Sequence, residues 1–230
     1  MDPSIKPPST VKGEDGKPMS FDIVLDPNCN QQIMYEVCAK DIIMIFTQGF
    51  NATIFAYGQS GSGKTFSMLG PDDVVDAIKE GAASVPEKVQ QLYGIIPRAV
   101  FDIFTWINLE LSKDRQIEFE IKIFYYEIYN ESLNNMLTMP PQKNLKMREL
   151  KNGTIAVLNC EPNYATSPED IFELLKLGQL NRAVAGTNQN ARSSRSHTIF
   201  VMDIEQKNPD GSVKSARLNL VDLAGSERIE

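Results

Sequence analysis

A glycine-rich stretch, residues 58–65, has the residue types and the spacing of a phosphate-binding loop. It fits the P-loop pattern G-x-x-x-x-G-K-[ST], in which glycines allow a tight turn and backbone N–H groups converge on an anion. Its lysine supplies a cation for the outer phosphates, and its threonine hydroxyl can bind Mg²⁺. A flexible glycine-serine surface loop is the alternative, but it does not explain the apolar strand expected directly before it, at residues 54–57. The pattern predicts nucleotide binding by Gly58, Gln59, Ser60, Gly61, Ser62, Gly63, Lys64 and Thr65.

A second stretch, Leu218–Glu227, places an acidic residue at the end of an apolar strand. The sequence Leu-Asn-Leu-Val-Asp-Leu-Ala-Gly-Ser-Glu is typical of a Walker B strand, whose aspartate holds Mg²⁺, commonly through water. Asp222 is that aspartate, and Gly225 would let a backbone N–H approach the terminal phosphate. Asp222 could instead only cap a strand end. We favour the metal-binding role because an acid in this position complements the P-loop.

A third stretch, residues 188–197, concentrates amide, hydroxyl and guanidinium groups. Taken by itself, it is equally well explained as a solvated polar loop. Beside a P-loop it fits a sensor of the γ-phosphate, with hydroxyls for Mg²⁺ or phosphate oxygens and an arginine for an ion pair. His197 is the only histidine of the chain. We expect its ring to be satisfied by hydrogen bonds rather than to act as a catalytic base.

The composition bounds the class of protein. The chain has 230 residues, 42% of them hydrophobic, and a net charge of −7, which suits one domain with a substantial core. The negative charge argues against general binding to nucleic acid or to an anionic membrane surface. No apolar run is long enough to span a bilayer. The three widely spaced cysteines indicate reduced thiols in a cytosolic setting.

Helices and strands alternate along the chain, which predicts an α/β fold with a mixed central sheet. Residues 1–19 are rich in proline and glycine and are expected to form a flexible lead-in. Residues 72–93 are expected to form a polar surface insertion that is partly helical. Helices are expected over 30–46, from 64 to about 69, from 97 to about 111, and over 168–184. Strands are expected over 21–25, 54–57, 116–125, 154–158, 198–205 and 213–221, the last two joined by a turn at 208–211.

Together, the three stretches resemble the P-loop, switch I and switch II of kinesin motor domains. Residues 55–65 match the P-loop segment, Asn190–His197 matches switch I, and Asp222–Glu227 matches switch II. Residues 94–98 and 127–131 are similar to the segments that connect these motifs in the family. The resemblance runs from about Phe21 to the end of the chain. It implies a three-layer P-loop NTPase-type sandwich, with residues 20–230 forming a partial, incomplete kinesin motor core.

The resemblance also implies a role for each matched residue. Thr65 and Ser194 would bind Mg²⁺ directly, and Asp222 would bind it through water. Ser193 and Gly225 would lie beside the γ-phosphate and the attacking water. The remaining implied roles are an Arg195–Glu227 ion pair that closes the two switches and relays a proton, and nucleotide contact by Asn190.

The implied cofactors are ATP and Mg²⁺, and the sequence lacks the Asn-Lys-x-Asp guanine reader of small GTPases. The implied partner of the complete motor is the microtubule, in the cytoplasm and on the cytoskeleton. The Arg-x-Arg-Pro strand that normally comes first in the family is not found in residues 1–20, and the chain stops soon after switch II. The alternative is therefore a truncated, nucleotide-binding but non-motile relative. Oligomeric state, direction of travel and cargo are not implied.

Overall fold

The computed structural model describes residues 9–13, 16–71, 74, 87–114, 116–151, 153, 155–185 and 194–227. Most of the insertion expected over residues 72–93 lies outside these ranges. Within it, the structure describes helix α5 (Glu87–Gln90). The side chains of Val74 and Tyr93 are buried in the main core, so these two positions are part of the packed body of the domain.

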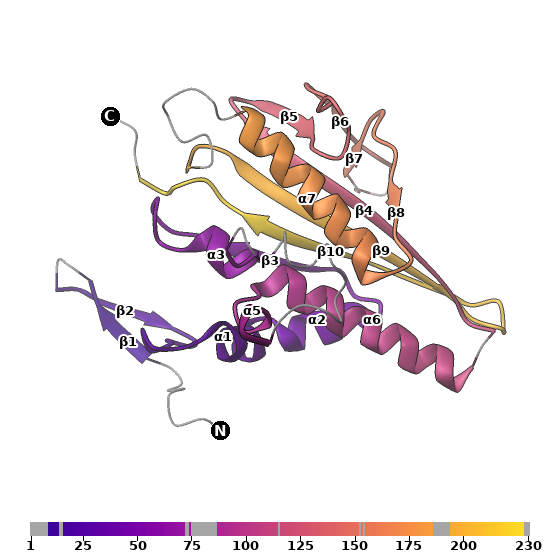
Figure 1. The fold of residues 1–230 in the computed structure, drawn as a ribbon, viewed down its shortest axis with the longest axis horizontal. Helices are drawn as coiled ribbons and strands as arrows, with labels where there is room; N and C mark the ends of the chain where they lie inside the picture. Colours follow the sequence, from indigo (N-terminus) through magenta and orange to yellow (C-terminus); the bar gives the residue numbers. More distant parts are fainter. Residues whose placement is uncertain are drawn as a thin grey trace.

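A mixed central sheet forms the body of the protein (Figure 1). Its strand order is β3 (Ala52–Ala56), β10 (Val213–Asp222), β9 (His197–Lys207), β4 (Glu118–Tyr129) and β5 (Ser132–Asn135), and β8 (Asn163–Tyr164) also pairs with β4. Strands β3 and β10 are parallel, and the other pairs are antiparallel. The expected mixed α/β sheet is confirmed, with β4 longer than the predicted 116–125.

Strands β9 and β10 form the expected antiparallel hairpin. Their turn is closed by hydrogen bonds from the N–H of Asn208 to the carbonyl of Ser212 and from the N–H of Gly211 to that of Asn208, both 2.9 Å. Figure 1 shows this turn at the end of the sheet that is remote from helix α3 (Lys64–Met68). The first residue of the hairpin, His197, and its last residue, Asp222, therefore lie at the other end of the sheet, beside the predicted nucleotide-binding residues.

The described helices pack on one face of the sheet. Helices α1 (Gln31–Cys38), α2 (Lys40–Thr47), α6 (Ile95–Lys113) and α7 (Pro168–Ala185) share one core cluster with alternate residues of β4, β9 and β10. The other face carries a smaller cluster around Tyr126 and Val201. Residues near the hairpin β6 (Met147–Glu149) and β7 (Ile155–Val157) pack on that cluster. Among the described residues, the three-layer sandwich is thus represented by the sheet and one helical layer.

Two helix predictions need correction. The single helix expected over 30–46 is two helices, because Ala39 adopts a non-helical φ of −125° between α1 and α2. The predicted cap is confirmed, since the side chain of Asn30 accepts a hydrogen bond from the N–H of Ile33 at 2.9 Å. Helix α6 begins at Ile95 rather than at Pro97, so the proline lies at the third helical position, where its missing N–H still costs no helical bond.

The N-terminus of α7 has the capping geometry that its sequence predicts. The N–H of Asp170 donates to the hydroxyl of Ser167 at 3.2 Å, and the N–H of Ser167 donates to the carboxylate of Asp170 at 3.0 Å. This reciprocal pair is a capping box, and Pro168 occupies the first helical position. Helix α7 is therefore fixed at its start, and it crosses the sheet toward the end where β10 terminates (Figure 1).

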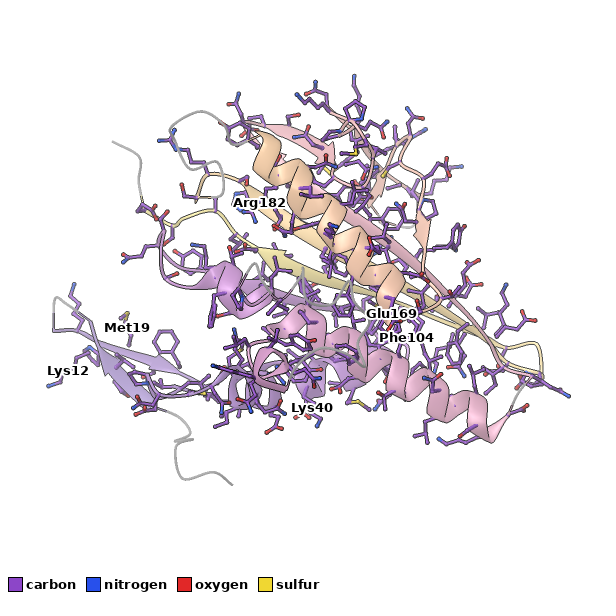
Figure 2. All side chains as sticks on the ribbon, in the orientation of Figure 1. Lys12, Met19, Lys40, Phe104, Glu169 and Arg182 are labelled. Atoms are coloured by element: carbon purple, nitrogen blue, oxygen red, sulfur yellow. The ribbon has the colours of Figure 1, made fainter. Side chains whose placement is uncertain are left out.

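The N-terminal region differs from its prediction. Strands β1 (Ser9–Lys12) and β2 (Pro18–Phe21) form an antiparallel hairpin inside the expected lead-in. The strand expected over 21–25 is thus displaced to 18–21. Figure 2 shows Lys12 and Met19 on this hairpin, which projects away from the sheet. Among the described helices, none combines the length and the apolar character needed to cross a membrane.

Candidate functional site

The parallel pairing of β3 and β10 brings the first two sequence motifs together. Ala56, at the end of β3, lies opposite Asp222, at the end of β10. The N–H of Leu223 then donates to the carbonyl of Ala56 at 3.2 Å, which continues the pairing past the end of the strands. Because parallel strands end at the same edge of a sheet, the loop after β3 and the loop after β10 leave the sheet side by side.

The loop after β3 is the predicted P-loop, residues 58–65. Gly63 has a φ of +91° immediately before α3, a conformation that only glycine adopts without strain. The ammonium of Lys64 donates to the carbonyl oxygens of Gly58 at 3.0 Å and Gln59 at 2.8 Å. The lysine therefore lies across its own loop. Its charge is held where the backbone turns, rather than extended into solvent.

Thr65 and Asp222 are in direct contact. The hydroxyl of Thr65 donates to Oδ2 of Asp222 at 2.6 Å. The aspartate is only 5% exposed, and its second oxygen, Oδ1, is buried with no hydrogen-bond partner. An oxygen of this kind needs a donor or a cation. A threonine hydroxyl beside a carboxylate with a spare oxygen is a donor set that Mg²⁺ and its water ligands prefer. The residues present thus fit the predicted magnesium.

The loop after β10 is held by its own backbone amides. The N–H of Gly225 donates to the carbonyl of Ser194 at 2.8 Å, and the N–H of Ser226 donates to the carbonyl of Gly58 at 3.0 Å. The N–H of Ala224 donates to Nδ1 of His197 at 3.0 Å. Three consecutive amides of switch II therefore contact switch I and the P-loop. The amide of Gly225, predicted to face a phosphate, is in this conformation engaged by Ser194.

The carboxylate of Glu227 is bound by the P-loop. It accepts hydrogen bonds from the N–H of Ser60, at 2.8 Å, and from the Ser60 hydroxyl. These donors, together with the nearby charge of Lys64, hold the pKa of Glu227 below its ordinary value. Arg195 is exposed, and no ion pair joins it to Glu227 in the part of the chain that the structure describes. The predicted switch pair is thus not formed in this conformation.

His197 has the structural role expected from the sequence. Its Nδ1 accepts the hydrogen bond from Ala224, so that nitrogen carries no proton and the ring links switch I to switch II. Ser194 and Arg195 lie three and two residues before His197 and are described by the structure. Asn190 and Ser193, the other two switch I residues predicted from the sequence, lie outside the described residues.

One residue of the site was missed by sequence reasoning. Arg182, in the last turn of α7, places its guanidinium NH1 3.7 Å from Oδ2 of Asp222, and both side chains are buried. An arginine near the C-terminal end of a helix is ordinary in sequence. No spacing signal connects it to an aspartate forty residues later, so only the packing of α7 on the sheet reveals the pair.

Comparison with known proteins agrees with this geometry. The family model described as the kinesin motor domain matches residues 4–230. The match thus begins further toward the N-terminus than the predicted start near Phe21. A solved structure described as "Structure of a fast kinesin: Implications for ATPase mechanism and interactions with microtubules" superposes with a TM-score of 0.80. It is 36% identical, and the match covers 100% of this chain and 59% of that one.

Two curated relatives are more than 40% identical in sequence to this chain. Kinesin heavy chain isoform 5C of Rattus norvegicus is 42% identical over 228 residues, which is 99% of this chain and 22% of the relative. Kinesin-related protein 5 of Dictyostelium discoideum is 46% identical over 214 residues, 93% of this chain and 20% of the relative. The chain spans about one fifth of the length of the curated relatives it matches. The P-loop NTPase-type sheet, the paired motifs and these matches agree, and the chain belongs to the kinesin motor domain family.

Proposed function

We propose that this chain is the nucleotide-binding core of an ATP-driven microtubule motor. The observation that carries the proposal is the 2.6 Å hydrogen bond from Thr65 to Asp222, which joins the P-loop to the Walker B strand at one edge of the sheet. A site built in this way holds a nucleoside triphosphate through its phosphates and one divalent cation. The family matches support ATP as the nucleotide and the microtubule as the partner of the whole protein.

In the proposed reaction, the P-loop of residues 58–65 surrounds the phosphates with backbone N–H groups. Lys64 exchanges its two carbonyl partners for the outer phosphate oxygens. Thr65 and Ser194 would hold Mg²⁺ and Asp222 would hold it through water, and the ion would supply positive charge to neutralise charge that develops on the phosphates. Ser193, Asn190 and Gly225 position the terminal phosphate and the attacking water.

The two switches would report whether the terminal phosphate is present. The amide of Gly225 leaves the carbonyl of Ser194 and donates to the γ-phosphate, which pulls switch II toward the P-loop. Glu227 then exchanges Ser60 for Arg195, which forms the ion pair that closes the site. Each exchange replaces existing hydrogen bonds by new contacts, so a ligand that favours one arrangement can decide between the two.

The proposal is tested by measuring the binding of ADP and ATP to the wild-type chain and to the Lys64→Ala variant. Loss of the ammonium should weaken binding of both nucleotides at least tenfold. Lys207→Ala, which removes an exposed lysine from the far end of β9, should leave binding unchanged. Equal binding by wild type and Lys64→Ala would refute the proposed site.

Microtubule-stimulated ATP hydrolysis by a chain extended to the length of its relatives tests the motor function separately. Stimulation that disappears in Lys64→Ala supports a motor. Nucleotide binding without stimulation and without co-sedimentation with microtubules would favour the alternative, a nucleotide-binding member of the family that does not move. The cytoplasm and the cytoskeleton are the location that this proposal implies.

A further inference from the structure

We propose that Arg182 is a positioning residue for the magnesium site, which it serves by fixing the charge and the orientation of the Asp222 carboxylate. The inference rests on the proposed nucleotide function. The first observation is burial, because the side chains of Arg182 and Asp222 are 8% and 6% exposed. An ionised carboxylate at this depth costs several kcal/mol unless an opposite charge lies nearby. Arg182 supplies that charge at 3.7 Å.

The geometry leaves one oxygen of the Asp222 carboxylate available. At 3.7 Å, the guanidinium attracts Oδ2 as a charge while the short hydrogen bond to this oxygen comes from Thr65. The other oxygen, Oδ1, keeps an open acceptor position. The cation and the hydroxyl thus both engage Oδ2, and Oδ1 is left unassigned. That is the arrangement required of an acid that accepts a hydrogen bond from a metal-bound water.

The segment of α7 that carries Arg182 is attached to the sheet by the neighbouring residues. The side chain of Asn181 donates to the carbonyl oxygens of Met136 at 2.8 Å and Thr138 at 3.0 Å. Gln179 donates to the hydroxyl of Tyr125 at 2.7 Å. These bonds attach the last two turns of α7 to β4 and to the segment after β5. Figure 2 shows Arg182 near the C-terminal end of α7, which lies across the sheet.

The charges of Arg182 and Asp222 both act on the pKa of the buried Tyr125. Burial raises the pKa of Tyr125, and the negative charges of Asp222 and Glu127 raise it further, whereas the positive charge of Arg182 lowers it. Tyr125, Arg182 and Asp222 therefore lie within electrostatic reach of one another beneath the site. Within the part of the chain that the structure describes, Arg182 is the only lysine or arginine that forms an ion pair with Asp222.

The test separates metal affinity from nucleotide affinity. Binding of a fluorescent ADP is titrated with Mg²⁺, and its metal-free affinity is measured in EDTA. Arg182→Gln should raise the Mg²⁺ concentration at half-saturation about tenfold or more, while the metal-free affinity stays unchanged. Arg182→Lys, which keeps the charge, should recover most of the loss. Glu173→Gln, an exposed change on the same helix, is the control and should behave as wild type.

A thermal-melting cycle in metal-free buffer keeps the proposal testable if Arg182→Gln is unstable. This variant leaves a buried carboxylate without a counter-charge, so its melting temperature should fall. Adding Asp222→Asn removes that charge and should restore part of the loss, as expected for two residues that act as a pair. Additive losses in the cycle would overturn the proposal.

An unchanged Mg²⁺ half-saturation in Arg182→Gln, or an equal loss of metal-free affinity, would also overturn it. Failure of the wild-type chain to bind fluorescent ADP is a different result. That outcome would instead reject the proposed nucleotide site on which the inference rests.

Discussion

The backbone N–H of Gly225 lies 2.8 Å from the carbonyl oxygen of Ser194, so the two switch loops are hydrogen-bonded to each other without any intervening side chain. Gly225 is also closely surrounded. A Cβ atom built on it would lie 2.5 Å from the Ser60 hydroxyl and 2.5 Å from a carboxylate oxygen of Glu227. An added side chain fits only if the side chains of Ser60 and Glu227 move aside, which breaks the contact between them.

Gly225→Ala should therefore separate the response to ATP from the binding of ADP. We expect ATP turnover to fall roughly 100-fold, because the added methyl group disrupts the contact of Glu227 with the P-loop beside the amide that is proposed to reach the γ-phosphate, while ADP affinity changes little. Turnover and ADP binding are measured on the same preparation. The control is Gly211→Ala in the β9–β10 turn, which costs roughly 1 kcal/mol of stability through its positive φ of +83° but touches no part of the site. Equal turnover by Gly225→Ala and wild type would contradict this role.

Ser60→Ala should raise the pKa of Glu227. The hydroxyl of Ser60 is the largest cause of the lowered pKa of this carboxylate, because a hydrogen bond to the charged form favours that form. The backbone N–H of Ser60 remains in the variant, so the pKa should move toward its ordinary value without reaching it. Carbon-detected NMR titration of the glutamate carboxyl measures the change. Ser112→Ala, at the end of α6, is the control, and an unchanged Glu227 titration would show that the contact is absent in solution.

Asp170→Asn should destabilise the domain in a pH-dependent manner. The backbone and hydroxyl donors of Thr166 and Ser167 lower the folded-state pKa of this carboxylate below its unfolded value of about 3.9. Its contribution is therefore complete above that unfolded value and is lost as the pH falls through the lowered folded pKa. We expect a loss of about 1 kcal/mol at neutral pH, which disappears in acid.

Urea unfolding of wild type and Asp170→Asn at several pH values measures this difference. The neighbouring Glu169→Gln serves as the control, because Glu169 is an exposed acid in the same helical turn. A loss of stability in Asp170→Asn that is independent of pH would exclude the charged capping box as its cause.

Leu218→Ala should cost about 2–5 kcal/mol of unfolding free energy, because this β10 side chain is fully buried in the core that the helices form with the sheet. Val213→Ala in the same strand should cost less than about 0.5 kcal/mol, since Val213 is 58% exposed. Chemical denaturation of the two variants measures the difference. Similar losses would mean that the described helices do not cover this face of the sheet in solution.

The sequence was most informative where local chemistry decides the structure. The P-loop, the Walker B aspartate, the turn at Asn208 and the capping box of α7 each depend on residues close together in the chain, and all were predictable. Thr65 and Asp222 meet because the two parallel strands that carry their loops end at one edge of the sheet.

Tertiary packing determined what the sequence could not predict. The break at Ala39 involves neither glycine nor proline, and the helices on either side of it both pack on α6. The pairing of Arg182 with Asp222 and of Ser60 with Glu227 likewise depends on elements that are distant in sequence. The predicted Arg195–Glu227 pair is not formed in this conformation, because Glu227 is bound by Ser60, and spacing alone does not decide between two accessible partners.

The turn between β9 and β10, residues 208–212, lies at the end of the hairpin opposite the switches, and this separation has a practical consequence. A peptide tag or a pair of dye-bearing residues inserted between Asp210 and Gly211 would leave every strand pair from His197 to Asp222 in place. A single residue inserted within β10 would instead turn Asp222 to the opposite face of the sheet. The far tip of the hairpin is thus the natural attachment point for a reporter that follows the switches without disturbing them.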